Sequence, residues 1–293
     1  MNPSLPDFTA LTNGLEPGAD GIWRAPRTAA ISYPEDGSKC SFTLEDTSFW
    51  FAHRNRVIVD AIRRELPPPG LLLDIGGGNG FVSRGLSQAS YRTIMLEPSE
   101  AGVANARARG LEQVICADFQ PNLFQPGAFD AAGLFDVIEH IHDHVGFLRG
   151  VATVLRPGGL VAIAVPALPL LFSADDTSAG HFRRYTRVSL AALLREAGFL
   201  PVRTSYFMAA TVLPVLLLRT LPSRLGLRQG TDRDRDRREH GEGSALKRVA
   251  AAALAAEAGI LARGGSMPVG TSCLALGRLP GANSANVVIP EHG

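Results

Sequence analysis

The stretch LLLDIGGGNG, residues 71–80, decides the fold of this chain. An apolar run ends in Asp74 and then breaks into glycines, and a helix-like stretch follows from 81 to 89. Glycine lets the backbone turn sharply and approach a ligand without a clash from a Cβ atom, and the start of the following helix offers free N–H groups. This strand, loop and helix predict a nucleoside-bearing cofactor at the carboxyl edge of a parallel sheet.

Three details of the loop favour S-adenosylmethionine over a dinucleotide. The residues Gly76, Gly78 and Gly80 follow the pattern G-x-G-x-G and not the G-x-G-x-x-G of dinucleotide-binding loops. Asp74 lies just before them, where a carboxylate repels a pyrophosphate and attracts an ammonium group. A second apolar run ends in Glu97, whose carboxylate can accept hydrogen bonds from both ribose hydroxyls.

The composition is that of a globular protein and excludes several classes. The chain has 293 residues, 45% of them hydrophobic, which allows one large α/β domain with additions or two small ones. A net charge of +1 gives no reason to expect a nucleic-acid partner. The N-terminal residues lack a signal-peptide pattern, and no apolar run reaches the roughly 18 residues of a spanning helix. Three cysteines far apart fit a reducing compartment, so a cytoplasmic location without a zinc site is expected: Cys40, Cys116 and Cys273.

Apolar periodicity predicts an alternation of strands and helices. After a first helix over 47–62, strands are expected at 71–75, 92–97, 112–117, 130–135 and 159–165, and helices at 80–89, 99–109 and 143–155. A long polar insertion, 166–187, comes next. The remaining expected elements are helices at 189–197, 207–222 and 244–262 and strands at 201–206 and 271–276.

Five short motifs occur along the chain in an order that is typical of one family. They are DIGGGNG at 74–80, LEP at 96–98, ADF at 117–119, FDVIEH at 135–140 and LRPGG at 155–159. Together they resemble class I S-adenosylmethionine-dependent methyltransferases, above all small-molecule enzymes of the ubiquinone-pathway type. The resemblance implies a Rossmann-like, mostly parallel sheet of seven strands with an antiparallel last strand and helices on both faces.

The domain organisation follows from composition and periodicity together with this resemblance. An N-terminal arm is expected at 1–45, the methyltransferase domain at 46–280, and a loose tail at 281–293. Within the domain, residues 207–265 are expected to form a helical lid between the sixth and last strands, with a dimer interface as the alternative. Its segment 229–243 is dense in Arg and Asp and has the composition of a mobile, solvated loop.

The resemblance also implies roles in cofactor binding for residues of the first two strand ends. Gly76 and Gly78 are expected to approach the methionine part of S-adenosylmethionine. Asp74 is expected to interact with its ammonium group, directly or through water. Glu97 is expected to pair with the ribose, and Pro98 to flank the adenine.

The next two strand ends complete the implied cofactor site. Asp118 is expected to accept a hydrogen bond from the adenine amino group, and Phe119 to offer its backbone N–H and a flat apolar edge. Phe135 and Asp136 are expected to end the fourth strand beside the reacting sulfonium.

The first helix carries three consecutive aromatic residues, which cannot all face one core. Trp50 and Phe51 are therefore candidates for a substrate contact, and Arg54, on the same face by helical spacing, for the cofactor carboxylate. The alternative is a helix packed on the sheet with Arg54 at its rim.

A methyl transfer to a hydroxyl requires a base, and histidine is suited to that role near neutral pH. His140 and His181 are the catalytic candidates, and His142 is a candidate substrate contact. In one alternative, Glu139 and His140 only satisfy backbone groups at the start of the next helix. In another, Asp136, Glu139 and His140 hold a divalent metal; we predict none, because many such transfers need no metal.

The polar insertion supplies a candidate substrate wall. His181 is followed by Arg183, Arg184 and Tyr185, and an arginine there could meet an anionic group of the methyl acceptor. The alternative is a loop held by ion pairs to Asp175 or Asp176. The segment 176–185 also resembles a signature of one subgroup associated with natural-product or glycan-lipid chemistry.

The predicted function is transfer of a methyl group to an O or C atom of a small molecule, with natural-product biosynthesis as one setting. One alternative is a methyltransferase for a lipid-linked or polyprenyl acceptor at the membrane surface. A second alternative is a cofactor-binding module without catalysis. The chain is expected to be a monomer or a homodimer.

Overall fold

The run LLLDI forms strand β3 (Leu71–Ile75), whose residues are all buried in the middle of the sheet. Strands covered on both faces are apolar at consecutive positions, without the alternation of a half-exposed strand. The parallel neighbours of β3, which are β4 (Arg92–Glu97) and β6 (Phe129–Phe135), are also largely buried. The computed structural model describes residues 8–25, 42, 45–46, 48–226 and 245–281.

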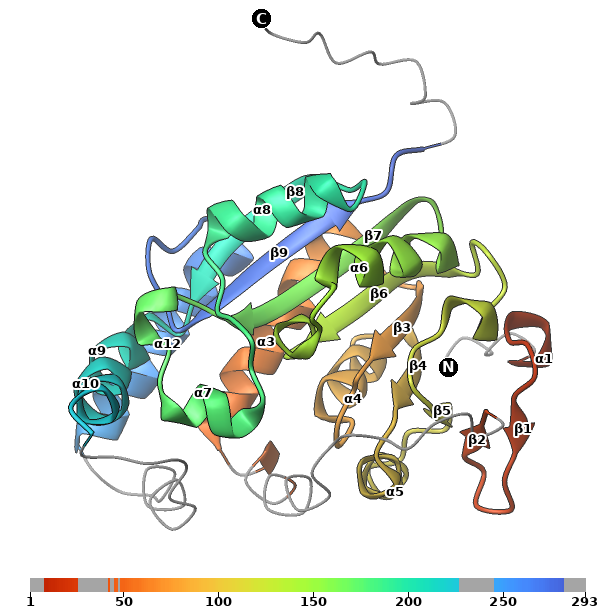
Figure 1. Cartoon of the computed structure of the whole chain (residues 1–293), viewed down its shortest axis with the longest axis horizontal. Helices are drawn as coiled ribbons and strands as arrows, with labels where there is room; N and C mark the ends of the chain where they lie inside the picture. The colour runs from red at the N-terminus through yellow and green to blue at the C-terminus, as the bar shows by residue number, and fades with distance from the viewer. Residues whose placement is uncertain (1–7, 26–41, 43–44, 47, 227–244, 282–293) are drawn as a thin grey trace, which may run out of the picture.

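The described part of the sheet has nine strands in the order β1-β2-β5-β4-β3-β6-β7-β9-β8 (Figure 1). Strands β5 (Val114–Cys116) and β7 (Leu155–Pro166) extend the parallel part, and β9 (Ser272–Arg278) runs antiparallel between β7 and β8 (Leu200–Phe207). Strands β3 to β9 confirm the predicted Rossmann-like arrangement with an antiparallel last strand. The expected number of seven strands is too low, because the N-terminal arm adds two.

Part of the predicted arm is folded against the edge of this sheet. Strands β1 (Glu16–Pro17) and β2 (Trp23–Arg24) pair antiparallel, and β2 continues the sheet parallel to β5. The short helix α1 (Phe8–Leu11) buries Phe8 against Trp23, with ring centroids 4.4 Å apart. An edge strand leaves backbone groups unpaired, and β2 satisfies such groups of β5.

Helices cover both faces of the sheet, as the sequence predicts. One face is covered by α3 (Phe49–Glu65), α4 (Phe81–Gln88), α5 (Glu100–Ala108) and α12 (Ala245–Ala262). The other face is covered by α6 (His144–Val154) and α8 (Arg187–Glu196). Shorter helices lie in the connections: η1 (Pro121–Leu123), η2 (Ile138–His140), η3 (Pro169–Leu171) and α7 (Ala174–Ala179).

The prediction of one apolar helix over 207–222 is wrong. Strand β8 continues to Phe207, and four short pieces follow: η4 (Ala209–Thr211), α9 (Val212–Val215), the π-helix η5 (Leu216–Thr220) and α10 (Leu221–Arg224). Pro214 and Pro222 have no backbone N–H, so the regular ladder of hydrogen bonds is interrupted at both positions.

A buried carboxylate helps to fix the Ala-rich helix α12 to the domain. Glu257 accepts a hydrogen bond from the backbone N–H of Met208 at 2.7 Å and from that of Ala209 at 2.8 Å, and His53 Nε2 lies 2.8 Å from its Oε1. These contacts join α12 to α3 and to the end of β8. The predicted loop 229–243 and the tail beyond residue 281 lie outside the described residues. None of the described helices is long and apolar enough to cross a membrane.

Candidate functional site

The glycine loop after β3 is held against the neighbouring strand and open toward solvent. The backbone N–H groups of Gly76 and Gly77 donate to the carbonyl oxygen of Leu96, at 2.8 and 3.1 Å. Gly76 and Gly78 have φ values of 69° and 56°, a region that favours glycine. A Cβ atom on Gly78 would meet nothing within 4 Å, so the loop leaves room for a ligand at this residue.

Asp74 lies beneath the loop and not on its open side. Its side chain is only 1% exposed, its Oδ2 accepts a hydrogen bond from Ser83 Oγ at 2.6 Å, and its Oδ1 has no hydrogen-bond partner among the described residues. Burial raises the pKa of Asp74 to about 6. A positively charged group of a ligand beside the unpartnered oxygen would reduce the free-energy cost of burying the ionised carboxylate.

The pKa of Asp74 predicts a pH-dependent affinity for the cofactor product S-adenosylhomocysteine, which carries the same ammonium group. If Asp74 contacts that group, as the sequence predicts, the group favours the ionised carboxyl, and protonation competes with binding as the pH falls through about 6. We expect up to about tenfold weaker binding at about pH 5 than at about pH 8. Calorimetry at several pH values measures this, and Asp74→Asn should remove most of the dependence. An equal pH dependence in the variant would contradict the role of Asp74.

Glu97 ends β4 and is positioned by two backbone groups. Its Oε2 accepts from the N–H of Gly78 and its Oε1 from the N–H of Ser99, both at 2.9 Å. Burial raises the pKa of this carboxyl, and the two N–H groups act in the opposite direction. The two backbone N–H groups hold the carboxylate in place, and its remaining lone pairs can accept hydrogen bonds from a diol.

The glycine loop and Glu97 border a cavity of about 460 Å³ at the carboxyl edge of the sheet, whereas Asp74 and Arg54 are not among the residues that line it. The predicted cofactor residues that line it are Gly76, Gly78, Glu97, Pro98, Asp118, Phe119 and Asp136. Phe135 belongs instead to the core between the sheet and α3. None of the described residues in the 207–265 insertion lines the cavity, and the lid role of this segment stays a prediction.

Arg54 reaches from α3 to the end of β6. Its Nη2 lies 2.7 Å from Oδ2 of Asp136, and its side chain is 15% exposed. Asp136 has a φ of 60°, a conformation that costs energy for a residue other than glycine and that is common at functional sites. The ion pair holds Asp136 at the cavity. Contact of Arg54 with a cofactor carboxylate stays a prediction.

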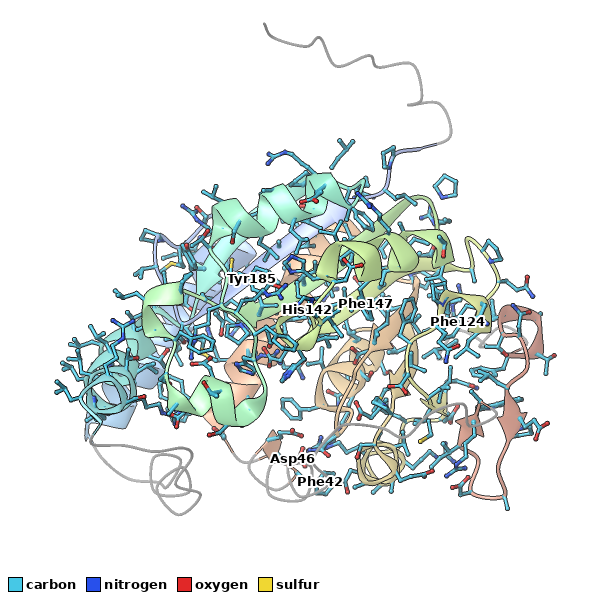
Figure 2. The ribbon with its side chains drawn as sticks, viewed as in Figure 1. Phe42, Asp46, Phe124, His142, Phe147 and Tyr185 are labelled. Atoms are coloured by element: carbon cyan, nitrogen blue, oxygen red, sulfur yellow. The ribbon has the colours of Figure 1, made fainter. Side chains whose placement is uncertain are left out.

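A polar cluster beside the glycine loop was not predicted from the sequence. Arg109 donates to Glu45 at 2.6 Å, to Asp46 at 3.1 Å and to the carbonyl oxygen of Asn79 at 2.8 Å. Glu45 and Asn79 line the cavity. Phe42, whose ring lies 4.3 Å from the Arg109 guanidinium, and Asp46 lie near α5 in Figure 2. Of these residues, only the asparagine within the glycine motif could have pointed to the cluster from the sequence, because the others lie far from the motif in the chain.

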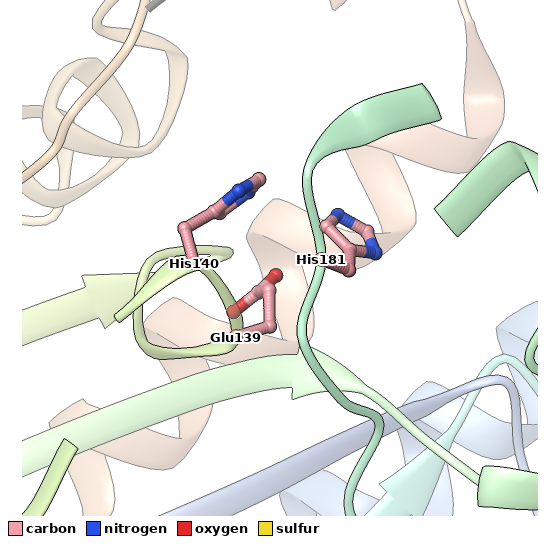
Figure 3. Close-up of side chains that lie close together, drawn as sticks. All are labelled: Glu139, His140 and His181. Atoms are coloured by element: carbon pink, nitrogen blue, oxygen red, sulfur yellow. The ribbon is translucent and has the colours of Figure 1, made fainter. Parts of the chain in front are cut away.

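Three side chains converge behind the end of β6 (Figure 3). Glu139 is fully buried, and neither carboxylate oxygen has a hydrogen-bond partner among the described residues. The rings of His140 and His181 lie 4.7 Å apart, edge to face. One ligand atom of each residue lies within 4.8 Å of the others, so the three could hold a metal ion. Of the three, His140 lines the cavity.

Burial alters the protonation of this cluster in opposite directions. It raises the pKa of Glu139 well above its usual range, and the nearby Asp136 adds to the effect. Burial lowers the pKa of His140, and the proximity of His181 lowers it further. Both groups therefore favour their neutral forms, and a neutral imidazole can accept a proton.

Asp176, in α7, orients one histidine of the cluster. It is 1% exposed, and its Oδ1 lies 3.0 Å from His181 Nδ1 and 2.7 Å from Arg184 Nε. The contact to Arg184 is the ion-paired loop that the sequence left open as an alternative. Interactions with His181 and Arg184 help to lower the pKa of Asp176 to about 2, so it is ionised at neutral pH.

The other candidate substrate residues contact neighbouring side chains and backbone carbonyl groups away from the cavity. Arg183 donates to the carbonyl oxygen of His142 and lies 2.9 Å from His144 Nδ1. Tyr185 donates to the carbonyl oxygen of Ile138 at 3.2 Å. Trp50 packs on Phe49, and Phe51 on Phe81. The structure places none of the residues Trp50, Phe51, His142, Arg183, Arg184 and Tyr185 on the cavity wall, and their roles stay predictions.

Comparisons with known proteins agree with this geometry. A family model described as "Methyltransferase domain" matches residues 50–204, just over half of the chain. A ubiquinone biosynthesis O-methyltransferase of Xanthomonas campestris pv. campestris is 26% identical over 163 residues, which cover 49% of this chain and 68% of the relative. A probable S-adenosylmethionine-dependent methyltransferase of Mycolicibacterium smegmatis is 30% identical over 169 residues, 57% of this chain and 65% of the relative.

A solved structure shares the fold at low sequence identity. Phosphoethanolamine N-methyltransferase 2 of Haemonchus contortus, in complex with S-adenosyl-L-methionine, aligns with a TM-score of 0.53 and 16% identity. The alignment covers 85% of this chain and 58% of that structure.

Proposed function

The chain belongs to the methyltransferase-domain family and is an S-adenosylmethionine-dependent methyltransferase, and on that premise we propose that it methylates a hydroxyl oxygen of a small acceptor placed beside His140. When bound, S-adenosylmethionine supplies a methyl group already activated on a sulfonium. The single observation that carries the proposal is His140, which lines the cavity at the end of β6, next to the segment that begins with Asp136.

The cavity residues suit the cofactor. Gly78 leaves open space, Glu97 is oriented to accept from the ribose hydroxyls, and Asp118 and Phe119 border the part of the cavity where the adenine is expected. Asp74 supplies a carboxyl oxygen that lacks a partner within the described chain. A cofactor-binding module without catalysis would share these features, and turnover in the acceptor panel separates the two alternatives.

His140 is the proposed general base. Its lowered pKa keeps the imidazole neutral near pH 7, so that it can take the proton from the acceptor hydroxyl as the oxygen attacks the methyl carbon. A hydrogen bond between Asp176 Oδ1 and His181 Nδ1 fixes the ring of His181, and that ring packs edge to face on His140. His181 is thus placed to restrict the orientation of the base.

A divalent cation is a second candidate role for the cluster of Glu139, His140 and His181. The fully buried carboxyl group of Glu139, without a described hydrogen-bond partner, favours it, since a cation would give a carboxylate oxygen a partner. Nitrogen and oxygen donors suit Mn²⁺ or Zn²⁺. Of the metal set considered from sequence, Asp136 is paired with Arg54 instead. If activity survives prolonged chelation, the prediction of a metal-free reaction stands.

An acceptor panel tests the proposed reaction. We would measure S-adenosylhomocysteine formation with phenols and catechols, with hydroxylated carboxylic acids, with prenylated phenols, and with carbon and amine nucleophiles. The name of the Xanthomonas relative supports the phenolic and prenylated compounds. We expect turnover of hydroxyl acceptors. Turnover of only carbon or amine nucleophiles would overturn the proposal, and the prenylated and anionic members separate the lipid-linked from the natural-product setting.

A further inference from the structure

An exposed apolar stripe follows the end of β8. Leu213, Leu217, Leu221 and Leu225 recur every four residues along α9, η5 and α10, and their exposed fractions lie between 40 and 72%. Single exposed leucines are ordinary, but residues at this spacing lie on one side of a helical segment. We refer to these four leucines as the leucine stripe. It lies away from the cofactor cavity, which none of its residues lines.

The charge of the segment that carries the leucine stripe favours one kind of partner. Residues 208–226 contain no Asp or Glu, and their only ionisable side chains are those of Arg219 and Arg224. Apolar residues interspersed with arginine suit the interface of a bilayer that contains anionic lipids. In a two-fold dimer through the same face, the arginines of both copies would approach one another, which is unfavourable.

The adjoining segment of the chain is a poor cover for the stripe. Residues 228–244 follow α10 closely and contain no apolar side chain. They cannot replace water over four leucines with apolar contacts. The occupant must therefore come from outside this segment.

The helical pieces that carry the stripe are joined to the segment before α7. We refer to Glu139, His140 and His181, the last of which follows α7, as the catalytic cluster. Ser223 Oγ accepts from the N–H of Ala174 at 2.9 Å, and Arg224 donates to the carbonyl oxygen of Leu170 at 2.6 Å. Figure 1 shows α10 beside α7, the helix that contains Asp176. Leu170 is itself 62% exposed and extends the apolar surface.

We propose that the leucine stripe docks on the surface of an anionic lipid bilayer, with α9 and α10 lying in the interfacial plane. The catalytic cluster would then sit near the membrane, where an acceptor with an apolar chain is dissolved. That consequence for the acceptor rests on the proposed function, whereas the docking itself does not.

Vesicle flotation tests the docking without any methyl transfer. The full chain is mixed with vesicles of phosphatidylcholine alone or of phosphatidylcholine with phosphatidylglycerol. We expect it to float with the mixed vesicles and to be released by salt. The double variant Leu217→Gln/Leu221→Gln should bind at least about tenfold more weakly. Val188→Gln, which changes a residue 80% exposed on α8, should bind like the unchanged chain.

Two further measurements keep the outcomes distinct. Thermal unfolding and affinity for S-adenosylhomocysteine should be the same in the double variant, which shows that its fold is intact. The proposal is overturned if the unchanged chain stays with the soluble fraction for both vesicles, or if the double variant floats as well as Val188→Gln. Concentration-dependent self-association that the double variant abolishes, without vesicle binding, would assign the stripe to a second copy of the chain and also overturn it.

Discussion

Glu97→Gln is expected to weaken binding of S-adenosylhomocysteine about 30-fold, because a hydrogen bond to a buried charged acceptor contributes about 2 kcal/mol. The amide keeps the shape of the side chain but loses the charge. Each carboxylate oxygen of Glu97 accepts from a backbone N–H, of Gly78 or of Ser99, so the new NH₂ group must also face a donor. Titration calorimetry measures the affinity.

A matched control lies three residues further along the chain. Glu100 is a partly exposed carboxylate of α5 that pairs with Arg24 on the surface, at 2.9 Å. Glu100→Gln should leave the affinity within about twofold, since exposed ion pairs contribute little. If Glu97→Gln binds as tightly as Glu100→Gln, Glu97 does not accept from the ribose, and the assigned orientation of the cofactor is wrong.

His140→Ala is expected to lower kcat by about 10²- to 10⁴-fold, the usual contribution of a general base. The acceptor for this measurement is whichever hydroxyl compound of the panel is turned over. Affinity for S-adenosylhomocysteine should change little, because the side chain acts on the acceptor proton. Steady-state rates and calorimetry on the same preparation separate the two effects.

The control for this variant is His142→Ala. His142 is an exposed histidine two residues away, whose ring packs on Phe182 with centroids 5.6 Å apart. It does not line the cavity, so its removal should leave kcat near normal, and a change confined to KM would support its predicted contact with the acceptor. Full activity of His140→Ala would leave the base role to His181 or to no residue. Equal losses in both variants would point to disturbance of the loop after β6 and not to proton transfer.

The cofactor half of the site could be predicted from the sequence for a local reason. A parallel strand that is buried on both faces is apolar at consecutive positions, and in an α/β sheet its carboxyl end lies at the ligand edge. Glu97 and Asp118 follow such strands and line the cavity. Asp74 also follows the rule, but only the structure revealed that its side chain lies under the loop.

The part of the site that faces the methyl acceptor could be predicted less completely from the sequence. The FDVIEH motif correctly brought His140 to the cavity, but the motif cannot tell which distant side chains approach it. His181 and Asp176 come from an insertion without regular periodicity. The prediction that Arg184 faces an acceptor and the alternative that it pairs with Asp176 used the same residues, and only packing distinguishes them.

By itself, the sequence determined the seven-stranded α/β core, the glycine loop and the carboxylates at the strand ends, because periodicity and backbone geometry act between near neighbours. The tertiary structure alone decided that β2 covers the edge of β5, that Arg54 pairs with Asp136, and that Glu139, His140 and His181 converge. Those contacts join segments far apart in the chain. Their formation depends on how those segments pack against one another once the core has formed.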